Sequence, residues 1–268
     1  MMIHVPPRRL LVAYDFSRRA ALAWRAALAL GRLWGCGVEA LHVVDPMESP
    51  GRAPLTLAPS RRGLLRRRLE QAIPGASSYF IALGDPAFCI LEHARWRRPD
   101  LIVLPYEGRR GVARLLKASV AEIVAGQACA PVLVLKGCPR RVRSVLFPIL
   151  AADAEHSALR QAAGIAAALS AHMTVMRVRR APWPRPRALS KLESVLETLD
   201  PAVRAVVKPD MRLAAGSPAR RLAEESGRHD LLVLPLAPGR AGSQALRLSE
   251  ARRLMRLSRA AVLTLPSE

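Results

Sequence analysis

Residues 100–136 have the types needed to attract an anion. A loop with Gly108 follows the apolar run 101–104, and apolar residues then recur at three-to-four-residue spacing from about Val112 to Gly126. This spacing predicts an amphipathic helix with one face on a sheet. The N–H groups at the start of a helix attract negative charge, and a glycine loop lets an anion approach them. The sequence therefore predicts an anion-attracting helix start at this loop.

The sequence contains none of the common catalytic motifs. Its six histidines include no pair at i, i+4 and no H-E-x-x-H motif. No Walker lysine follows a glycine loop, and no G-x-S-x-G elbow occurs. His42 is expected in the core of a strand, while Asp85 and Asp100 suit a helix cap and a strand edge better than an acid/base pair. We therefore expect that the protein is not an enzyme.

The elements that position these residues are apolar strands alternating with helices. Right-handed crossovers between such strands make a five-stranded doubly wound parallel sheet. The expected strands are Leu10–Tyr14, Val38–Val44, Tyr79–Leu83, Leu101–Leu104 and Val132–Leu135. Helices are expected from Arg18 with Ser17 as its cap, over Leu64–Ile73, from Pro86 to Trp96 with Asp85 as its cap, and from Val112; Pro46–Arg62 is expected as a surface loop.

The strand, loop, helix and strand of residues 100–136 occur again later in the chain. Pro105 recurs as Pro235, Ser119 as Ser249 and Val132 as Val262, each 130 positions later. We therefore expect an α/β protein of two tandem domains related by a pseudo-two-fold axis. Their expected limits are residues 1–137 and 144–268. In the second copy we expect strands at 145–149, 172–178 and 211–215, and helices at 154–169 and 189–199.

Cysteine usage and hydropathy predict a cytoplasmic protein without a membrane span. The four cysteines form no C-x-x-C pair, and three lie in apolar segments, so buried reduced thiols are expected rather than disulfides or a metal site. No apolar stretch reaches the roughly 18 residues that a membrane helix requires. The cysteines are Cys36, Cys89, Cys129 and Cys138.

The formal net charge is +21, and nearly all of the positive charge comes from arginine. Such a field attracts polyanions without specifying one. One interpretation is a compositional preference for arginine on ordinary solvated helix faces. The other is weak polyanion binding through Arg61, Arg62, Arg66 to Arg68 and the loop Arg179–Arg187. Few aromatic residues, which single-strand binding would use for stacking, are interleaved with the charge.

Several short segments together resemble the universal stress protein family. They are Tyr14-Asp15-Phe16-Ser17 after the first strand, His42-Val43-Val44 at the end of the second, Gly84-Asp85-Pro86 before a helix, and Ala130-Pro131-Val132 at the last strand. The resemblance covers nearly all of the first copy and, more weakly, the second. It implies Rossmann-like domains, dimers or tandem copies, and a division into ATP-binding and non-binding branches.

The nucleotide motif of that family has three glycines followed by Ser or Thr. Aligning Ser119 with the last position places Pro105, Gly108 and Ala118 at the three glycines, so one glycine remains. Proline has neither an N–H nor freedom in φ. The resemblance thus implies a degenerate pocket with no cofactor, closed by the proline. The alternative is ATP in copy one.

The resemblance also implies where a nucleotide would lie in copy one. Asp15 and Val43 occupy the positions that meet the ribose and the adenine. Gly108, Ser119 and the N–H of Val120 remain at the phosphates.

Copy two departs further, because Leu150 replaces Asp15 and Pro238 replaces Gly108. It is expected to pair with copy one through the last strands, 132–135 and 262–265, as two subunits would in a dimer. A homodimer and an unidentified protein partner also stay open.

The expected function is a non-enzymatic tandem stress-response module that binds or regulates through its surfaces. The first alternative is an adenine-nucleotide-binding stress protein that uses copy one. The second is a nucleic-acid-associated basic protein.

Overall fold

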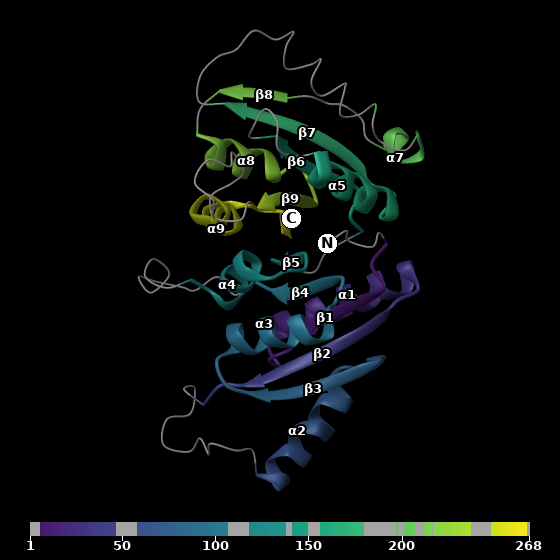
Figure 1. The fold of residues 1–268 in the computed structure, drawn as a ribbon, viewed down its shortest axis with the longest axis vertical. Helices are drawn as coiled ribbons and strands as arrows, with labels where there is room; N and C mark the ends of the chain where they lie inside the picture. Colours follow the sequence, from purple (N-terminus) through teal and green to yellow (C-terminus); the bar gives the residue numbers. More distant parts are fainter. Residues whose placement is uncertain are drawn as a thin grey trace. The chain divides into compact units, whose positions relative to one another are not determined.

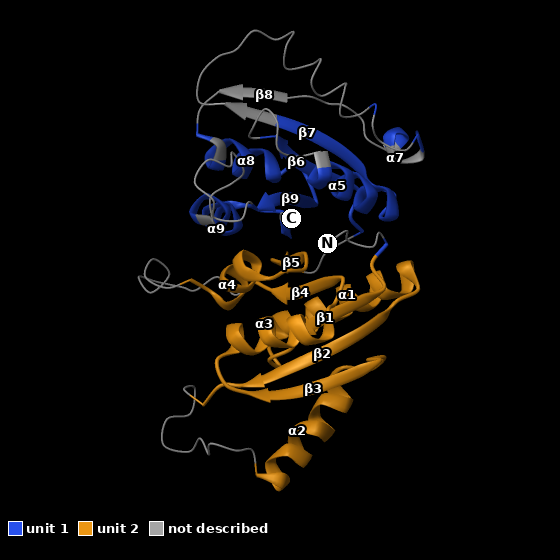
Figure 2. Cartoon of the chain, viewed as in Figure 1, with its two compact units in different colours: residues 1–6, 139–268 blue, residues 7–138 orange. Residues whose placement is uncertain are grey.

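The computed structural model describes residues 6–46, 58–106, 118–137, 141–149, 156–179, 197, 201–206, 212–215, 217–236 and 248–266 (Figure 1). The chain divides into two compact units, residues 7–138 and residues 139–268 with the first six residues (Figure 2). The domain limits expected from the sequence and the axis relating the copies stay predictions. In the described part, no helix is long and apolar enough to cross a bilayer.

The N-terminal unit is a five-stranded parallel sheet with helices on both faces. Its strands lie in the order β3-β2-β1-β4-β5, and every neighbouring pair is parallel. The strands are β1 (Arg9–Ala13), β2 (Gly37–Val44), β3 (Ser78–Leu83), β4 (Leu101–Pro105) and β5 (Val132–Leu135). The helices are α1 (Arg18–Trp34), α2 (Pro59–Ala72), α3 (Pro86–Arg97) and α4 (Val120–Gln127). The predicted doubly wound sheet is confirmed.

The strand order decides which helices share a face of this sheet. The connections from β1 to β2 and from β2 to β3 run in one direction across the sheet, whereas those from β3 to β4 and from β4 to β5 run in the other. Because parallel crossovers are right-handed, α1 and α2 belong to one face and α3 and α4 to the other. In agreement, the indole N–H of Trp24 in α1 donates to the carbonyl of Pro74 just after α2, and α3 packs against α4.

The C-terminal unit repeats this topology. Its strands lie in the order β8-β7-β6-β9-β10, again all parallel, so the tandem repeat of one fold is confirmed. They are β6 (Ser144–Ile149), β7 (His172–Arg179), β8 (Arg212–Ala215), β9 (Leu231–Leu236) and β10 (Ala261–Pro266). The helices are α5 (His156–Ala168), α7 (Pro201–Val206), α8 (Pro218–Ser226) and α9 (Leu248–Leu257). Of the helix expected at 189–199 only residue 197 is described, and the loop 180–187 lies outside the described residues.

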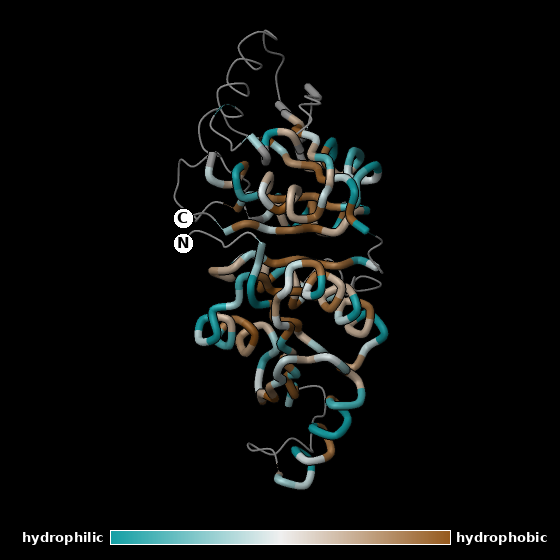
Figure 3. The backbone as a smooth tube through the Cα atoms, turned by 90° about the vertical axis from the view of Figure 1, so that its right-hand side faces the viewer, coloured by the Kyte–Doolittle hydropathy of each residue, from teal (hydrophilic) through white to brown (hydrophobic). Residues whose placement is uncertain are grey.

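The central strands of each unit are hydrophobic (Figure 3). Small buried residues of the helices, such as Ala20, Ala23 and Ala27 of α1, complete the cores. Leu10, Leu11 and Ile102 are fully buried in the first sheet. Gly31 of α1 is required for this packing, because an added Cβ would lie 2.7 Å from Cγ2 of Val38 on β2. A helix rich in alanine can therefore approach the sheet closely.

An aspartate binds the main chain at the start of the central strand in each unit. The Asp100 carboxylate accepts hydrogen bonds from the N–H groups of Arg8 and Arg9, both at 2.9 Å. Asp230 accepts from the N–H groups of Arg143 and Ser144 at 2.9 and 3.0 Å. The strand-edge role predicted for Asp100 is confirmed, and the structure repeats it 130 residues later.

Three expectations about local structure are wrong. The helix expected from Val112 begins at Val120, because Ser119 is extended and caps it. The helix expected from Leu64 begins at Pro59, since proline suits the first turn of a helix. The thiols are not buried: Cys129 is exposed, and both Cys36 and Cys89 are partly exposed. Residue Cys138 lies outside the described residues.

Replacement of Asp100 tests its contribution to the fold. In Asp100→Ala two main-chain donors lose a charged acceptor, so the free energy of unfolding should fall by about 2 kcal/mol in urea denaturation. Asp230→Ala should cost a similar amount. Glu92→Ala is the control, because its exposed ion pair with Arg95 should be worth under about 1 kcal/mol. Equal losses in all three variants would contradict the role of the aspartates.

His93 of α3 makes the fold sensitive to acid. Its ring packs against Phe80 and Trp96 at centroid distances of 4.5 and 5.9 Å, and its Nε2 has no hydrogen-bond partner among the described residues. Burial lowers the pKa of His93; Arg97 lowers it further and Glu39 opposes the shift. The folded state thus favours the neutral ring.

The His93 ring binds a proton more readily in the unfolded chain than in the folded chain. The stability contributed by neutral His93 is therefore complete above a pH of about 6.5 and is lost as the pH falls through the folded pKa. Urea denaturation from about pH 7 to pH 5 should show a smaller loss of stability for His93→Phe than for the parent. An unchanged pH dependence would rule out this role.

Candidate ligand cleft

A cleft of 460 Å³ lies at the carboxyl ends of the strands in the N-terminal unit. β1 pairs with β2 on one side and with β4 on the other, so the strand order reverses at β1 and β4. In sheets of this type the loops diverge at such a reversal and leave a crevice. The lining residues come from the ends of β1, β2 and β4 and from the first turns of α3 and α4: Ala13, Tyr14, Asp15, Leu41, Val43, Asp45, Asp85, Pro86, Ala87, Ile90, Leu104, Pro105, Ala118, Ser119, Val120, Ala121 and Ile123.

One wall of the cleft offers hydrogen-bond donors from the start of α4. Ser119 caps this helix: its Oγ accepts from the N–H of Glu122 at 3.2 Å, and the Glu122 carboxylate accepts from the N–H of Ser119 at 3.4 Å. The N–H groups of Val120 and Ala121 precede the first intrahelical bond, so they have no partner within the helix. Together with the Ser119 hydroxyl hydrogen, they can bind an oxygen acceptor on a ligand.

The capping box is held by a buried carboxylate. The Glu122 side chain, 2% exposed, accepts a hydrogen bond from the Tyr106 hydroxyl at 3.3 Å. Arg19 of α1 donates to the Tyr106 carbonyl at 2.9 Å, and the Lys136 ammonium lies 4.9 Å from the Tyr106 ring centroid. The donor wall is therefore fixed by contacts outside the cleft.

Other residues of the lining offer acceptors. Asp15, Asp45 and Asp85 line the cleft, and two of them also order the chain beside it. The Asp15 carboxylate accepts from the N–H of Ser17 at 2.9 Å, and that of Asp85 accepts from the N–H of Phe88 at 2.8 Å, as its predicted capping role requires. Each has a second oxygen that can accept a hydroxyl or amino group of a ligand.

The main chain of Val43 adds a further acceptor. The register of β1 with β2 ends at Ala13 and Leu41, and the N–H of Tyr14 still donates to the Leu41 carbonyl. Alternate residues of a strand turn their main-chain groups to the same side. The Val43 carbonyl therefore faces the cleft beyond the end of β1.

The turn after β1 is packed by aromatic rings. Phe16 has φ of 64°, an uncommon conformation outside glycine, and its ring lies edge-on to Tyr14 and His42 at 5.5 and 4.7 Å. The Arg68 guanidinium covers the Phe16 ring at 4.2 Å. Burial raises the pKa of Tyr14, and the neighbouring Asp15 raises it further, whereas Arg68 and Arg25 lower it.

His42 supports this turn from β2. It is buried, as predicted, and its Nδ1 lies 2.7 Å from the Tyr14 carbonyl. The contact joins the second strand to the residue before Asp15, so it helps to position that carboxylate.

The structure brings four of the five predicted contact residues together. Asp15, Val43, Ser119 and Val120 line the cleft, and Gly108 lies outside the described residues. Pro105 also lines the cleft, and the closure of the pocket by this proline stays a prediction.

Asp45 was missed as a lining residue. The available signal was its position, because it directly follows β2 just as Asp15 closely follows β1. The carboxyl ends of parallel strands meet at one edge of the sheet, so polar residues just after them gather there.

The described part of the C-terminal unit does not reproduce the Ser119 cap. Ser249, the counterpart of Ser119, lies inside the first turn of α9 rather than before the helix. Leu150 and Pro238 lie outside the described residues. The absence of binding in copy two stays a prediction.

A model of the Universal stress protein family matches residues 7–136. A crystal structure of a universal stress protein from Archaeoglobus fulgidus is similar along the whole chain, with 16% identity, coverage of 96% of each chain and a TM-score of 0.68. A crystal structure of a second protein with this fold, from Pseudomonas aeruginosa, is 17% identical to this chain. The alignment covers 97% of this chain and 93% of that chain, with a TM-score of 0.69.

A protein of that family from Burkholderia pseudomallei is 30% identical over 47% of this chain and 94% of its own, with a TM-score of 0.36. Because the first two structures are only 16% and 17% identical to this chain, their similarity shows a shared fold.

Replacement of Ser119 tests the donor wall. Ser119→Ala removes the cap of α4, so the free energy of unfolding should fall by about 1 kcal/mol in urea denaturation. Ser119→Thr keeps a hydroxyl at the same place and should retain most of the stability. A loss in Ser119→Thr as large as in Ser119→Ala would show that the hydroxyl is not the stabilising group.

Proposed function

Because the chain belongs to the universal stress protein family, we propose that it is a non-enzymatic stress-response binding module whose cleft in residues 7–138 holds an adenosine-containing ligand. The observation that carries this proposal is the meeting of Asp15, Val43, Ser119 and Val120 in one cleft, although more than 100 positions separate the first from the last in the sequence. The volume of 460 Å³ lies in the range of small-molecule sites.

The acceptors and donors of the cleft suit the two ends of such a ligand. Ribose hydroxyls donate hydrogen bonds, which the carboxylate of Asp15 can accept. The exocyclic amino group of adenine donates to a main-chain carbonyl such as that of Val43. Phosphate oxygens accept from the helix start at Ser119 and Val120.

The part of the cleft where a phosphate would bind offers few groups that attract an anion. Pro105 lies on the cleft at the carboxyl end of β4 and has no N–H to offer an anion. No lysine or arginine occurs among the described lining residues, and three aspartates do. The cleft should therefore recognise the nucleoside part more strongly than a triphosphate chain.

The residues of the cleft also support a role without catalysis. Among its described lining residues, none is a histidine, cysteine or lysine. Asp15 and Asp85 accept hydrogen bonds from main-chain N–H groups, so they order the turn into α1 and cap α3. These are structural and binding roles, so binding rather than turnover is expected.

Ligand-induced stabilisation tests the proposal. Adenosine or AMP in excess should raise the melting temperature, because a ligand at about ten times its Kd stabilises the fold by about 1.4 kcal/mol. Asp15→Asn should abolish most of the rise. Glu92→Gln, which removes a carboxylate on α3 outside the cleft, should keep it. No shift with any adenine compound at millimolar concentration, or an equal shift in Asp15→Asn, would overturn the proposal.

Pro105→Gly tests the phosphate end separately. Glycine restores an N–H and lets the main chain approach an anion, so isothermal titration should show the affinity for ATP rising relative to adenosine by about tenfold, or about 1.4 kcal/mol. The ratio of the two affinities is unaffected by any general loss of stability. An unchanged ratio would show that Pro105 does not limit phosphate binding.

A further inference from the structure

Arginine is concentrated on one face of the N-terminal unit. α1 and α2, which share a face of the sheet, contain nine arginines and a single acidic residue, Glu70. α3 and α4 on the other face contain two arginines and two glutamates. A compositional preference for arginine would place the charge on both faces. The one-sided distribution therefore needs a different explanation.

All nine side chains are exposed, but Arg19 donates to the Tyr106 carbonyl at 2.9 Å and is set apart. Most of the other eight are not neutralised. Arg66 pairs with Glu70 at 3.2 Å, and Arg68 stacks on Phe16. For the others, no ion pair or hydrogen bond to their side chains is found within the described residues. We call this set the α1/α2 arginine surface: Arg18, Arg25 and Arg32 on α1, and Arg61, Arg62, Arg66, Arg67 and Arg68 on α2.

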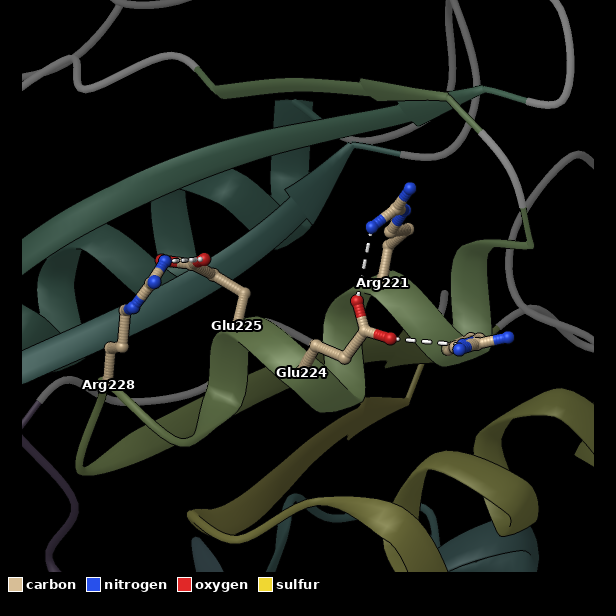
Figure 4. A network of polar contacts seen from close by, with 5 residues as sticks. Arg221, Glu224, Glu225 and Arg228 are labelled. Atoms are coloured by element: carbon tan, nitrogen blue, oxygen red, sulfur yellow. Dashed lines mark hydrogen bonds and ion pairs between the residues drawn. The ribbon is translucent and has the colours of Figure 1, made fainter.

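The same chain shows what an ordinary solvated helix face looks like. On α8 the arginines are matched by glutamates three or four positions away (Figure 4). Arg220 and Arg221 of the helix both pair with Glu224, at 3.0 and 3.2 Å, and Arg228 just after the helix pairs with Glu225 at 3.0 Å. Such pairing neutralises most of the positive charge that would attract a polyanion.

Three arginines of α1 and α2 also occupy positions where they destabilise their helices. Arg18 begins α1, and Arg61 and Arg62 lie in the first turn of α2, where the helix dipole favours negative charge; neither first turn has an acidic residue. Arg62 and Arg66 are like charges four positions apart. Charges placed against the dipole and against each other are better explained by an external anion than by the fold.

We propose that the α1/α2 arginine surface binds the phosphate backbone of double-stranded nucleic acid without reading its sequence. Arg18, Arg25 and Arg32 recur every seven positions, so they form a stripe of about 20 Å along α1. Arginines contacting phosphates orient a protein on a duplex but carry little sequence information.

A duplex fits this surface better than a single strand or a membrane. Neither helix has an exposed aromatic residue among the large exposed apolar side chains, so unpaired bases would have no stacking platform. Leu69 of α2 is fully buried, and the exposed Leu33 of α1 and Leu64 of α2 are single residues rather than the continuous apolar face that enters a bilayer. The interaction that this surface offers is the attraction of guanidinium groups to phosphates.

Fluorescence anisotropy with a labelled duplex of about 20 base pairs and arbitrary sequence tests the proposal. In a salt series from about 50 to 200 mM, each phosphate contact contributes roughly 0.9 to the slope of log K against log salt. The variant Arg61→Gln/Arg62→Gln/Arg67→Gln should bind at least tenfold more weakly at about 0.1 M salt and reduce that slope by up to about 2.7. Arg18→Gln/Arg25→Gln/Arg32→Gln should weaken binding similarly.

A matched control removes the same charge elsewhere. Arg160, Arg204 and Arg253 are exposed residues of α5, α7 and α9, and their joint replacement by glutamine should leave affinity and slope unchanged within about twofold. Replacing the three α2 arginines by lysine should restore most of the binding, because lysine also attracts phosphate. Circular dichroism checks that each variant keeps its fold.

Three results would overturn the proposal. Equal weakening by the control and the α2 variant would show that only net charge matters. Binding of a single strand as tightly as the duplex would contradict the duplex geometry. Binding to phosphatidylserine vesicles without binding to the duplex would assign the surface to membranes.

Discussion

The parallel pairing of β1 with β4 is the constraint on which the N-terminal unit depends. Leu10, Leu11 and Val12 pair with Leu101, Ile102 and Val103, all of them buried. Residues so far apart in sequence meet only if the chain crosses the sheet, and burial of both faces of the two strands supplies the driving force. Asp100 secures the pairing by accepting main-chain hydrogen bonds at the start of β1. The reversal of strand order, the opening of the cleft and the division of helices between two faces all follow from this pair.

The same local interactions that end the strands and begin the helices also line the cleft. Ser119 caps α4, Asp85 caps α3, and Asp15 orders the turn into α1. Each satisfies a main-chain group that would otherwise lack a partner, and each leaves capacity for one further hydrogen bond. The site therefore needs no elements beyond those of the fold. Pro105 is the exception, because it removes a main-chain donor from the position where an anion would be held.

The two copies separate what the fold requires from what a site requires. Asp100 and Asp230 make the same contacts to the start of the central strand in both units, since each sheet needs its central strand anchored. The cleft positions differ: Asp15 corresponds to Leu150 and Gly108 to Pro238. The charge differs as well. Arginines on α1 and α2 are mostly unmatched, whereas those on α8 are paired with glutamates.

The sequence by itself determined the repeat, the order of strands and helices, the parallel topology and the caps at Ser17 and Asp85. These depend on local patterns and on the handedness of crossovers, which act over short stretches of chain. It could not place the start of α4, because apolar spacing continues through residues 112–119 while the capping geometry of Ser119 ends the pattern. It also overestimated the burial of Cys129, since an apolar neighbourhood in sequence does not set exposure. Only the tertiary structure decided that Asp45 joins Asp15 and Ser119 in one cleft, and that the unmatched arginines share a face. Both depend on which chain segments the sheet brings side by side, and that is a property of the packed strands rather than of any single segment.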